Sequence, residues 1–167
     1  LDPNRMFIPT YNALIKKNLG KNIKKKSDHP LTIMFAVGGA GAQTDIALEI
    51  VKSLKNKLLR KEINFIFSAG LRNEVKTHFE EGITKIGLKS VLGKNLRVIF
   101  AMSKKAYFED FNKELRNTDI LWTKPSELSF YTALGLPIIL TEPIGPHEEY
   151  NQKWLIDMGS GHVQEDP

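Results

Sequence analysis

The chain has 167 residues, of which 41% are hydrophobic and 26% charged, as is ordinary for one compact domain with a real core. No apolar run approaches the roughly 20 residues that a membrane-spanning helix needs, and the start lacks the apolar core of a signal peptide. The absence of cysteine excludes disulfides and thiolate metal sites, and the four histidines are too scattered to suggest a metal cluster. We expect a cytoplasmic protein without a metal site.

The net charge of +5 is concentrated in one short segment. Two interpretations stay open: a patch that binds phosphate or an anionic membrane surface, with each lysine contributing about 1 kcal/mol, or a solvated linker. No aromatic residue interrupts the run as a nucleic-acid platform would require, so we expect no nucleic-acid partner. The lysines are Lys16, Lys17, Lys21, Lys24, Lys25 and Lys26.

Residues 1–30 form a lead-in, with a short helix over Tyr11–Leu19 that ends at Gly20 and is followed by the lysine-rich linker. The chain starts without methionine and stops shortly after a helix-ending glycine. We therefore expect residues 31–167 to be one domain of a longer protein.

Short apolar runs after the lead-in predict buried strands, each bounded by turn residues. Strand and helix alternate along the chain, which indicates a Rossmann-like, doubly wound parallel sheet in three α/β/α layers. The expected strands are Thr32–Val37, Ile63–Ser68, Leu96–Ala101, Ile120–Trp122 and Ile138–Leu140.

Apolar stripes at helical spacing predict the intervening helices. A further helix opens at Pro125-Ser126, with Phe130, Tyr131 and Leu134 packed onto the sheet, and the last helix ends at Gly159. Trp122 and Trp154 are expected in the core or at a domain interface. The three stripes are Ile46, Ile50, Val51, Leu54 and Leu58; then Leu71, Val75, Phe79 and Ile83; then Tyr107, Phe108, Phe111 and Leu115.

A glycine-rich turn follows the first strand and reads Gly38-Gly39-Ala40-Gly41-Ala42-Gln43. Such a turn exposes backbone N–H groups at the positive end of a helix dipole, which favours a phosphate. No Gly-Lys-Ser/Thr follows, so the turn is no P-loop. The third glycine of a dinucleotide fingerprint is replaced by Thr44, and the second strand lacks a carboxylate at its end. Taken alone, the turn could be purely structural.

A polar stretch from Thr123 to Gly161 supplies a second set of groups at the carboxyl ends of strands, including a loop over Glu142–Glu149. Parallel strands bring these ends to one edge of the sheet, so both sets should meet there. Anion donors beside hydroxyl acceptors suit a nucleoside diphosphate sugar. The donors are Lys124, Ser126 and Ser129, the acceptors are Glu127, Glu142, Glu148 and Glu149, and Asn151 can do both.

Three segments resemble the carboxyl-terminal half of GT-B glycosyltransferases, and are most similar to family 28, which includes the peptidoglycan N-acetylglucosaminyltransferases and monogalactosyldiacylglycerol synthases. The resemblance spans about residues 31–161. The segments are Val37-Gly-Gly-Ala-Gly-Ala-Gln43, Ala133-Leu-Gly-Leu-Pro137-Ile-Ile-Leu140, and His147-Glu-Glu-Tyr-Asn151 with Gly159-Ser-Gly161.

The resemblance implies a domain that binds a nucleotide sugar, most often a UDP-sugar, without a metal or other cofactor. It implies that Gly39, Ala40 and Gly41 lie by the diphosphate and sugar. The Met102-Ser103 loop would lie near the base, and His147 and Glu148 would reach the sugar. The chain departs from the family at Phe130, where a ribose-binding Glu is common, and Glu127 could replace that contact.

Three functional hypotheses follow. The first is the donor-binding half of an inverting, metal-independent glycosyltransferase, inactive alone because its base lies in an amino-terminal acceptor-binding half. The second is a non-catalytic subunit whose catalytic partner is a separate chain. The third is a sugar-nucleotide epimerase, which would turn over without an acceptor.

Overall fold

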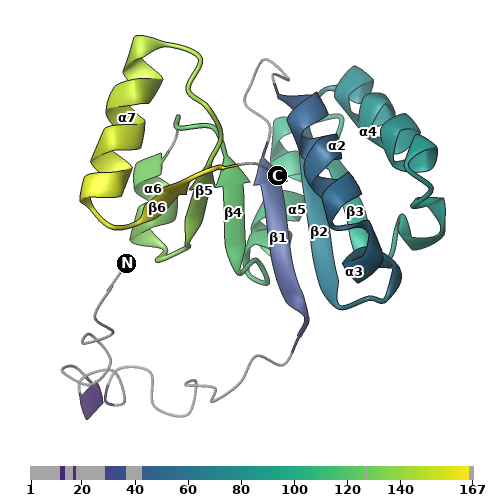
Figure 1. Ribbon diagram of the computed structural model, residues 1–167, viewed down its shortest axis with the longest axis horizontal. Coiled ribbons are helices and arrows are strands. Elements are labelled where there is room, and N and C mark those ends of the chain that lie inside the picture. Colours follow the sequence, from purple (N-terminus) through teal and green to yellow (C-terminus); the bar gives the residue numbers. More distant parts are fainter. Residues whose placement is uncertain (1–11, 14–16, 18–28, 37–42, 127, 166–167) are drawn as a thin grey trace.

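A computed structural model describes residues 12–13, 17, 29–36, 43–126 and 128–165. Its centre is a six-stranded, all-parallel sheet with strand order β3-β2-β1-β4-β5-β6, so the predicted Rossmann-like sheet is confirmed (Figure 1). The strands are β1 (Leu31–Ala36), β2 (Ile63–Gly70), β3 (Leu96–Phe100), β4 (Ile120–Thr123), β5 (Ile138–Leu140) and β6 (Gly161–Val163).

Helices cover both faces of this sheet, as the three-layer prediction requires. One apolar cluster packs strands β1 and β2 against the first three helices. Two other clusters pack residues of strands β1 to β5 against the last three helices. The helices are α2 (Thr44–Ser53), α3 (Lys55–Leu59), α4 (Asn73–Lys85), α5 (Lys104–Leu115), α6 (Leu128–Ala133) and α7 (Pro146–Asp157), with a 3-10 turn, η2 (Lys89–Val91), before β3.

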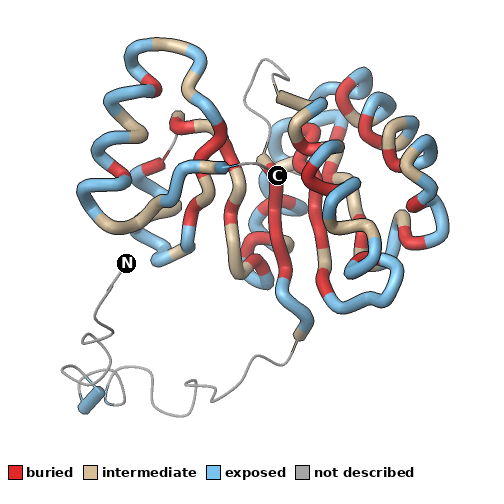
Figure 2. Tube along the Cα trace, viewed as in Figure 1, coloured by how far each residue is buried: buried red, intermediate tan, exposed pale blue. Residues whose placement is uncertain are grey.

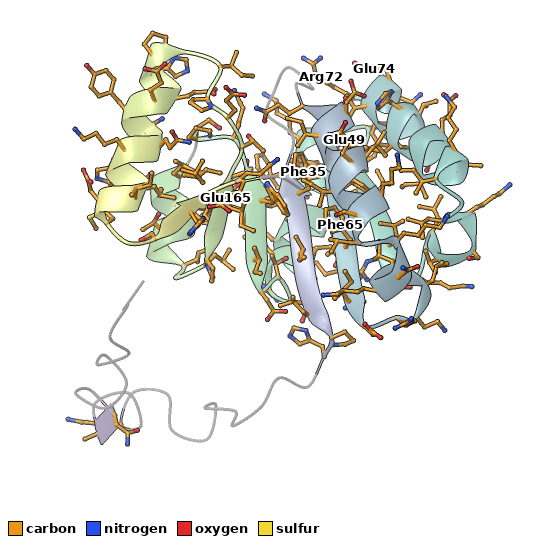
Figure 3. The ribbon with its side chains drawn as sticks, viewed as in Figure 1. Phe35, Glu49, Phe65, Arg72, Glu74 and Glu165 are labelled. Carbon is orange, nitrogen blue, oxygen red and sulfur yellow. The ribbon has the colours of Figure 1, made fainter. Side chains whose placement is uncertain are left out.

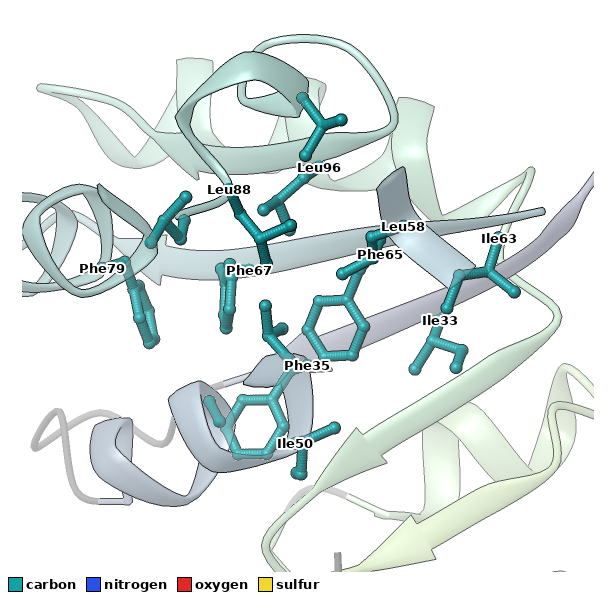
Figure 4. Packing of buried hydrophobic residues seen from close by; sticks show 14 of the residues in the cluster. Ile33, Phe35, Ile50, Leu58, Ile63, Phe65, Phe67, Phe79, Leu88 and Leu96 are labelled. Atoms are coloured by element: carbon teal, nitrogen blue, oxygen red, sulfur yellow. The ribbon is translucent and has the colours of Figure 1, made fainter. Parts of the chain in front are cut away.

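Four phenylalanines lie in the largest cluster, which fills the space between β1, β2 and helices α2, α3 and α4 (Figure 4). The Phe67 and Phe79 rings stack with their centroids 4.2 Å apart, and Phe65 lies 5.0 Å from Phe67. All three are buried, and full burial of such a side chain contributes about 1.5–3 kcal/mol. This cluster anchors the sheet.

The predicted helical stripes are confirmed except at particular residues. The first stripe is divided between α2 and α3, which meet at Leu54. Leu71 precedes α4 and is exposed, and Phe108 is 56% exposed because Tyr107, Phe111 and Leu115 already occupy the inward face of α5. Both predictions for Leu71 and Phe108 were therefore wrong.

The region after β4 differs most from prediction. Helix α6 begins at Leu128 rather than at Pro125-Ser126, so the expected helix start with free N–H groups is not there. Tyr131 packs inward, but Phe130 and Leu134 are more than half exposed. With only six residues, α6 has one face against the sheet and leaves the other uncovered.

Sequence patterns did not predict β6, which pairs in parallel with β5. Its three residues carry a short and largely exposed pattern, Gly161-His162-Val163, which is no strand signal by itself. Gly161 fits there because an added Cβ would lie 2.3 Å from Leu155 Cδ2 of α7. Strand β6 thus extends the sheet beyond β5, and helix α7 packs against it.

Candidate polar site at the carboxyl edge of the sheet

The strand order reverses between β1 and β4, which is where open α/β sheets bind ligands. Ala36 and Thr123, the last residues of these strands, are register partners, and Thr123 Oγ1 donates a hydrogen bond to the Ala36 carbonyl at 3.0 Å. The glycine turn begins two residues after Ala36, at Gly38. Its residues Gly38, Gly39, Ala40 and Gly41 lie outside the described residues, as does Glu127.

Gln43 joins the end of the glycine turn to the loop after β5. Its backbone is left-handed, with φ of 70°. Its side-chain oxygen accepts a hydrogen bond from Thr141 Oγ1 at 2.6 Å, and its Nε2 donates to the Glu142 carbonyl at 2.9 Å. The segments that follow β1 and β5 therefore meet at one edge, as the sequence predicted.

Lys124 and Glu148 form the shortest ion pair among the described residues. Lys124 Nζ lies 2.5 Å from Glu148 Oε1, and the Ile144 N–H donates to Glu148 Oε2 at 2.9 Å. Glu148 is only 1% exposed. The structure thus pairs Lys124, expected as a free charge for a diphosphate, with a carboxylate of its own chain, and it buries Glu148, which was expected to reach a sugar.

Burial of Glu148 by itself would raise its pKa, because a charged carboxylate loses hydration. The hydrogen bonds from Lys124 and from the Ile144 N–H, with the nearby positive charge of Lys124, outweigh that effect and lower the pKa below its ordinary value. Glu148 lies in the first turn of α7, where the helix dipole also favours a negative charge. The pair fixes the start of α7 to the segment after β4.

Asn151 makes a second link between the same two segments. Its Nδ2 group donates to the carbonyls of Pro125 and Ser126 at 3.1 and 3.3 Å. Asn151 therefore uses its amide hydrogens on the protein backbone, and Ser126 contributes a carbonyl to the fold. Both were expected to contact a ligand, and both hold α7 against the chain between β4 and α6.

A hollow of about 720 Å³ opens beside these links. It lies where α2, α7 and the ends of β5 and β6 approach one another, and Glu142, Glu149 and Glu165 supply carboxylates to its wall. Glu165, labelled in Figure 3, follows β6. Gln152 also lines the hollow, and its buried Nε2 has no hydrogen-bond partner within the described chain. The hollow therefore offers carboxylate acceptors.

Other predicted residues lie apart from this hollow. Met102 is exposed and Ser103 caps α5 by accepting from the Ala106 N–H at 3.3 Å, after β3 at the far edge of the sheet. Ser129 is exposed on α6. His147 is in the first turn of α7 rather than in a loop, is largely exposed, and has its Nε2 3.9 Å from Glu148 Oε1.

Thr123, Thr141, Gln152, Gln164 and Glu165 were not singled out from the sequence. Thr123 is the last residue of β4 and Thr141 directly follows β5, and a hydroxyl at the end of an apolar run is a usable signal. Gln152, Gln164 and Glu165 carried no such signal, because they converge only once α7 and β6 are packed beside β5.

Fold and site together define a Rossmann-like α/β domain with a polar crevice at the carboxyl ends of its strands. The chain belongs to the family described as a domain of unknown function (DUF6938), whose model matches residues 13–107 and 88–166. No curated protein matches the chain. The family that matches is not described as a glycosyltransferase, so the likeness to that class stays a hypothesis.

Two features are absent from the residues that the structure describes. None of their helices is long and apolar enough to cross a membrane. Nor do His, Asp and Glu side chains gather in threes within the described ranges to hold a metal ion. The lysine run over residues 21–26 lies outside them, so the membrane interpretation stays a prediction.

Proposed function

We propose that this domain binds a nucleoside diphosphate sugar as the donor-binding half of a metal-independent, inverting glycosyltransferase. The observation that carries the proposal is the carboxylate-lined hollow at the carboxyl edge of the sheet, whose lining residue Glu142 is hydrogen-bonded to Gln43 at the end of the glycine turn. A ligand at that edge would meet backbone N–H donors on one side and hydroxyl acceptors on the other.

The charges divide such a ligand into two parts. Glu142, Glu149 and Glu165 would repel a diphosphate, but carboxylates are good acceptors for sugar hydroxyls. The diphosphate would then lie toward the glycine turn and the start of α2, where backbone dipoles favour an anion.

Lys124 takes a different role from the one expected for it. Because Lys124 is bound to Glu148, it holds α7 in position beside the hollow and does not bring a free charge to a phosphate. The base that activates an acceptor hydroxyl is not evident around the hollow, so it would come from an acceptor-binding half or partner subunit.

The test is a thermal-shift titration with UDP and with several UDP-sugars. A ligand at a hundred times its dissociation constant stabilises the domain by about 2.7 kcal/mol. Gly41→Val should abolish the shift with both ligands, because a side chain blocks approach of a phosphate to the backbone. Glu149→Gln should weaken the UDP-sugar shift and leave the UDP shift unchanged.

Glu81→Gln is the matched control, because Glu81 is an exposed carboxylate on α4. Normal binding to the Gly41→Val variant would contradict the proposal, and so would the lack of any shift. Turnover of a UDP-sugar by the full-length protein without an acceptor would indicate an epimerase instead.

A further inference from the structure

A groove of about 460 Å³ lies between α5 and α6, at the edge of the sheet where the strands begin, and its α6 side is apolar. Phe130, Leu134 and Leu136 form that wall, and the opposite wall, with Asn112, Leu115, Arg116 and Thr118, is mostly polar. Phe130 is 57% and Leu134 is 52% exposed, which is high for large apolar side chains beside a groove. This edge is opposite the carboxyl edge that carries the polar hollow.

The amino-terminal chain enters the domain beside this groove. His29 Nδ1 lies 3.6 Å from Asp119 Oδ2, and Asp119 directly follows Thr118 in the groove wall. Asp119 Oδ2 also accepts from the Thr32 N–H at 2.8 Å, which fixes the start of β1 there. The nine residues from 20 to 28 can span up to about 30 Å, so the preceding segment reaches the groove easily.

That preceding segment is amphipathic. Tyr11, Leu14, Ile15 and Leu19 follow the spacing of one helical face. Asn12, Ala13 and Lys17 are described as helical and exposed, and Ala13 and Lys17 lie away from the apolar face, whereas Asn12 flanks it. The family model begins at residue 13, so most of the segment belongs to the domain itself. A helix this short is marginal in water and needs a surface to pack on.

We propose that residues 11–19 dock as a helix in the groove between α5 and α6, with their apolar face on Phe130 and Leu134. The docked helix covers the apolar side of α6 and leaves Lys16 and Lys17 facing solvent. The lysine-rich linker then lies at the edge opposite the polar hollow. The inference does not depend on the proposed function, because it concerns the other edge of the sheet.

Disulfide trapping tests the docking directly, since the chain has no cysteine of its own. Mild oxidation of the Ile15→Cys/Leu134→Cys double variant should give an intramolecular disulfide at least about tenfold faster than a freely moving segment would. Ala13→Cys/Leu134→Cys is the control, because residue 13 is on the opposite helical face. Ile15→Cys/Ile139→Cys tests the alternative hollow of about 280 Å³ beside Trp122 and Ile139.

Equal rates for the first pair and its control would overturn the proposal, as would faster trapping at Ile139. A disulfide between molecules, seen as a dimer on a non-reducing gel, would instead assign the groove to a second copy of the chain. A mutant cycle gives an independent readout: Leu134→Asp should lower Tm in the full chain but not after deletion of residues 1–19. Equal Tm losses in both backgrounds would also overturn the proposal.

Discussion

The two ends of the sheet are stabilised in different ways. Around β1, β2 and helices α2 to α4, one cluster of the described residues contains sixteen buried apolar side chains, whereas four form the cluster between β5, α6 and α7. At the β5–β6 end, polar contacts hold the elements together: the Lys124–Glu148 ion pair and the hydrogen bonds of the Asn151 and Gln43 side chains. In Figure 2, buried chain runs through the central strands, and α7 is mostly exposed.

The apolar cluster around β1 and β2 holds the sheet together, and we call it the anchor. The polar β5–β6 end carries the candidate site. Apolar packing is insensitive to direction and tolerates polar neighbours poorly, so it suits the end of the sheet that carries the first two crossovers. Directional contacts at the other end fix the angles of α7 and of the loops, and they keep oxygen atoms near the hollow. The end with less apolar burial is thus the end that can present polar groups to a ligand.

The largest expected effect tests the anchor. Phe67→Ala should reduce the free energy of unfolding by about 3–5 kcal/mol, because it leaves a cavity beside Phe79. Phe108→Ala is the matched control and should change it by less than about 0.5 kcal/mol, since Phe108 is exposed. Urea unfolding measures both. Similar losses at the two positions would remove the contrast between anchor and surface.

The second effect tests the polar end. Lys124→Met should reduce the free energy of unfolding by about 3 kcal/mol near pH 7, because it leaves the buried Glu148 carboxylate unpaired. Lys153→Met, on the exposed side of α7, should have almost no effect.

The same pair predicts a pH dependence of defined sign. The folded pKa of Glu148 is lowered from 4.5, so the pair contributes fully above that value, and its contribution is lost as the pH falls through the lowered pKa. Urea unfolding at several pH values should therefore show the difference between the wild type and Lys124→Met shrinking below about pH 4. A constant difference down to pH 2 would contradict an ionised Glu148.

The smallest effect concerns the junction of α7 and β6. Gly161→Ala should cost about 1–2 kcal/mol, because the added Cβ meets Leu155 Cδ2 at 2.3 Å and Leu140 Cδ1 at 3.2 Å. Ser160→Ala, one residue earlier, should lie within about 0.5 kcal/mol of the wild type. Thermal unfolding would compare the two, and an unchanged Gly161→Ala variant would show that β6 is loosely held.

The sequence by itself determined the sheet. Continuous apolar runs such as Thr32–Val37, separated by stripes at helical spacing, depend on local periodicity and burial, and β1 to β5 appear where these patterns place them. The turn at Gly135 and the end of α7 before Gly159 also follow from local rules, because both glycines have a positive φ.

Only the tertiary structure decided how the polar residues are used. Glu148 is buried and paired, whereas its neighbour Glu149 is exposed at the hollow, and no local pattern distinguishes the two. The difference in burial depends on where Lys124 and β6 lie in the fold. The same holds for Phe130, whose exposure depends on which face of a six-residue helix meets the sheet. Periodicity is encoded along the chain, whereas charge pairing and the shape of a hollow arise between segments that are far apart in it.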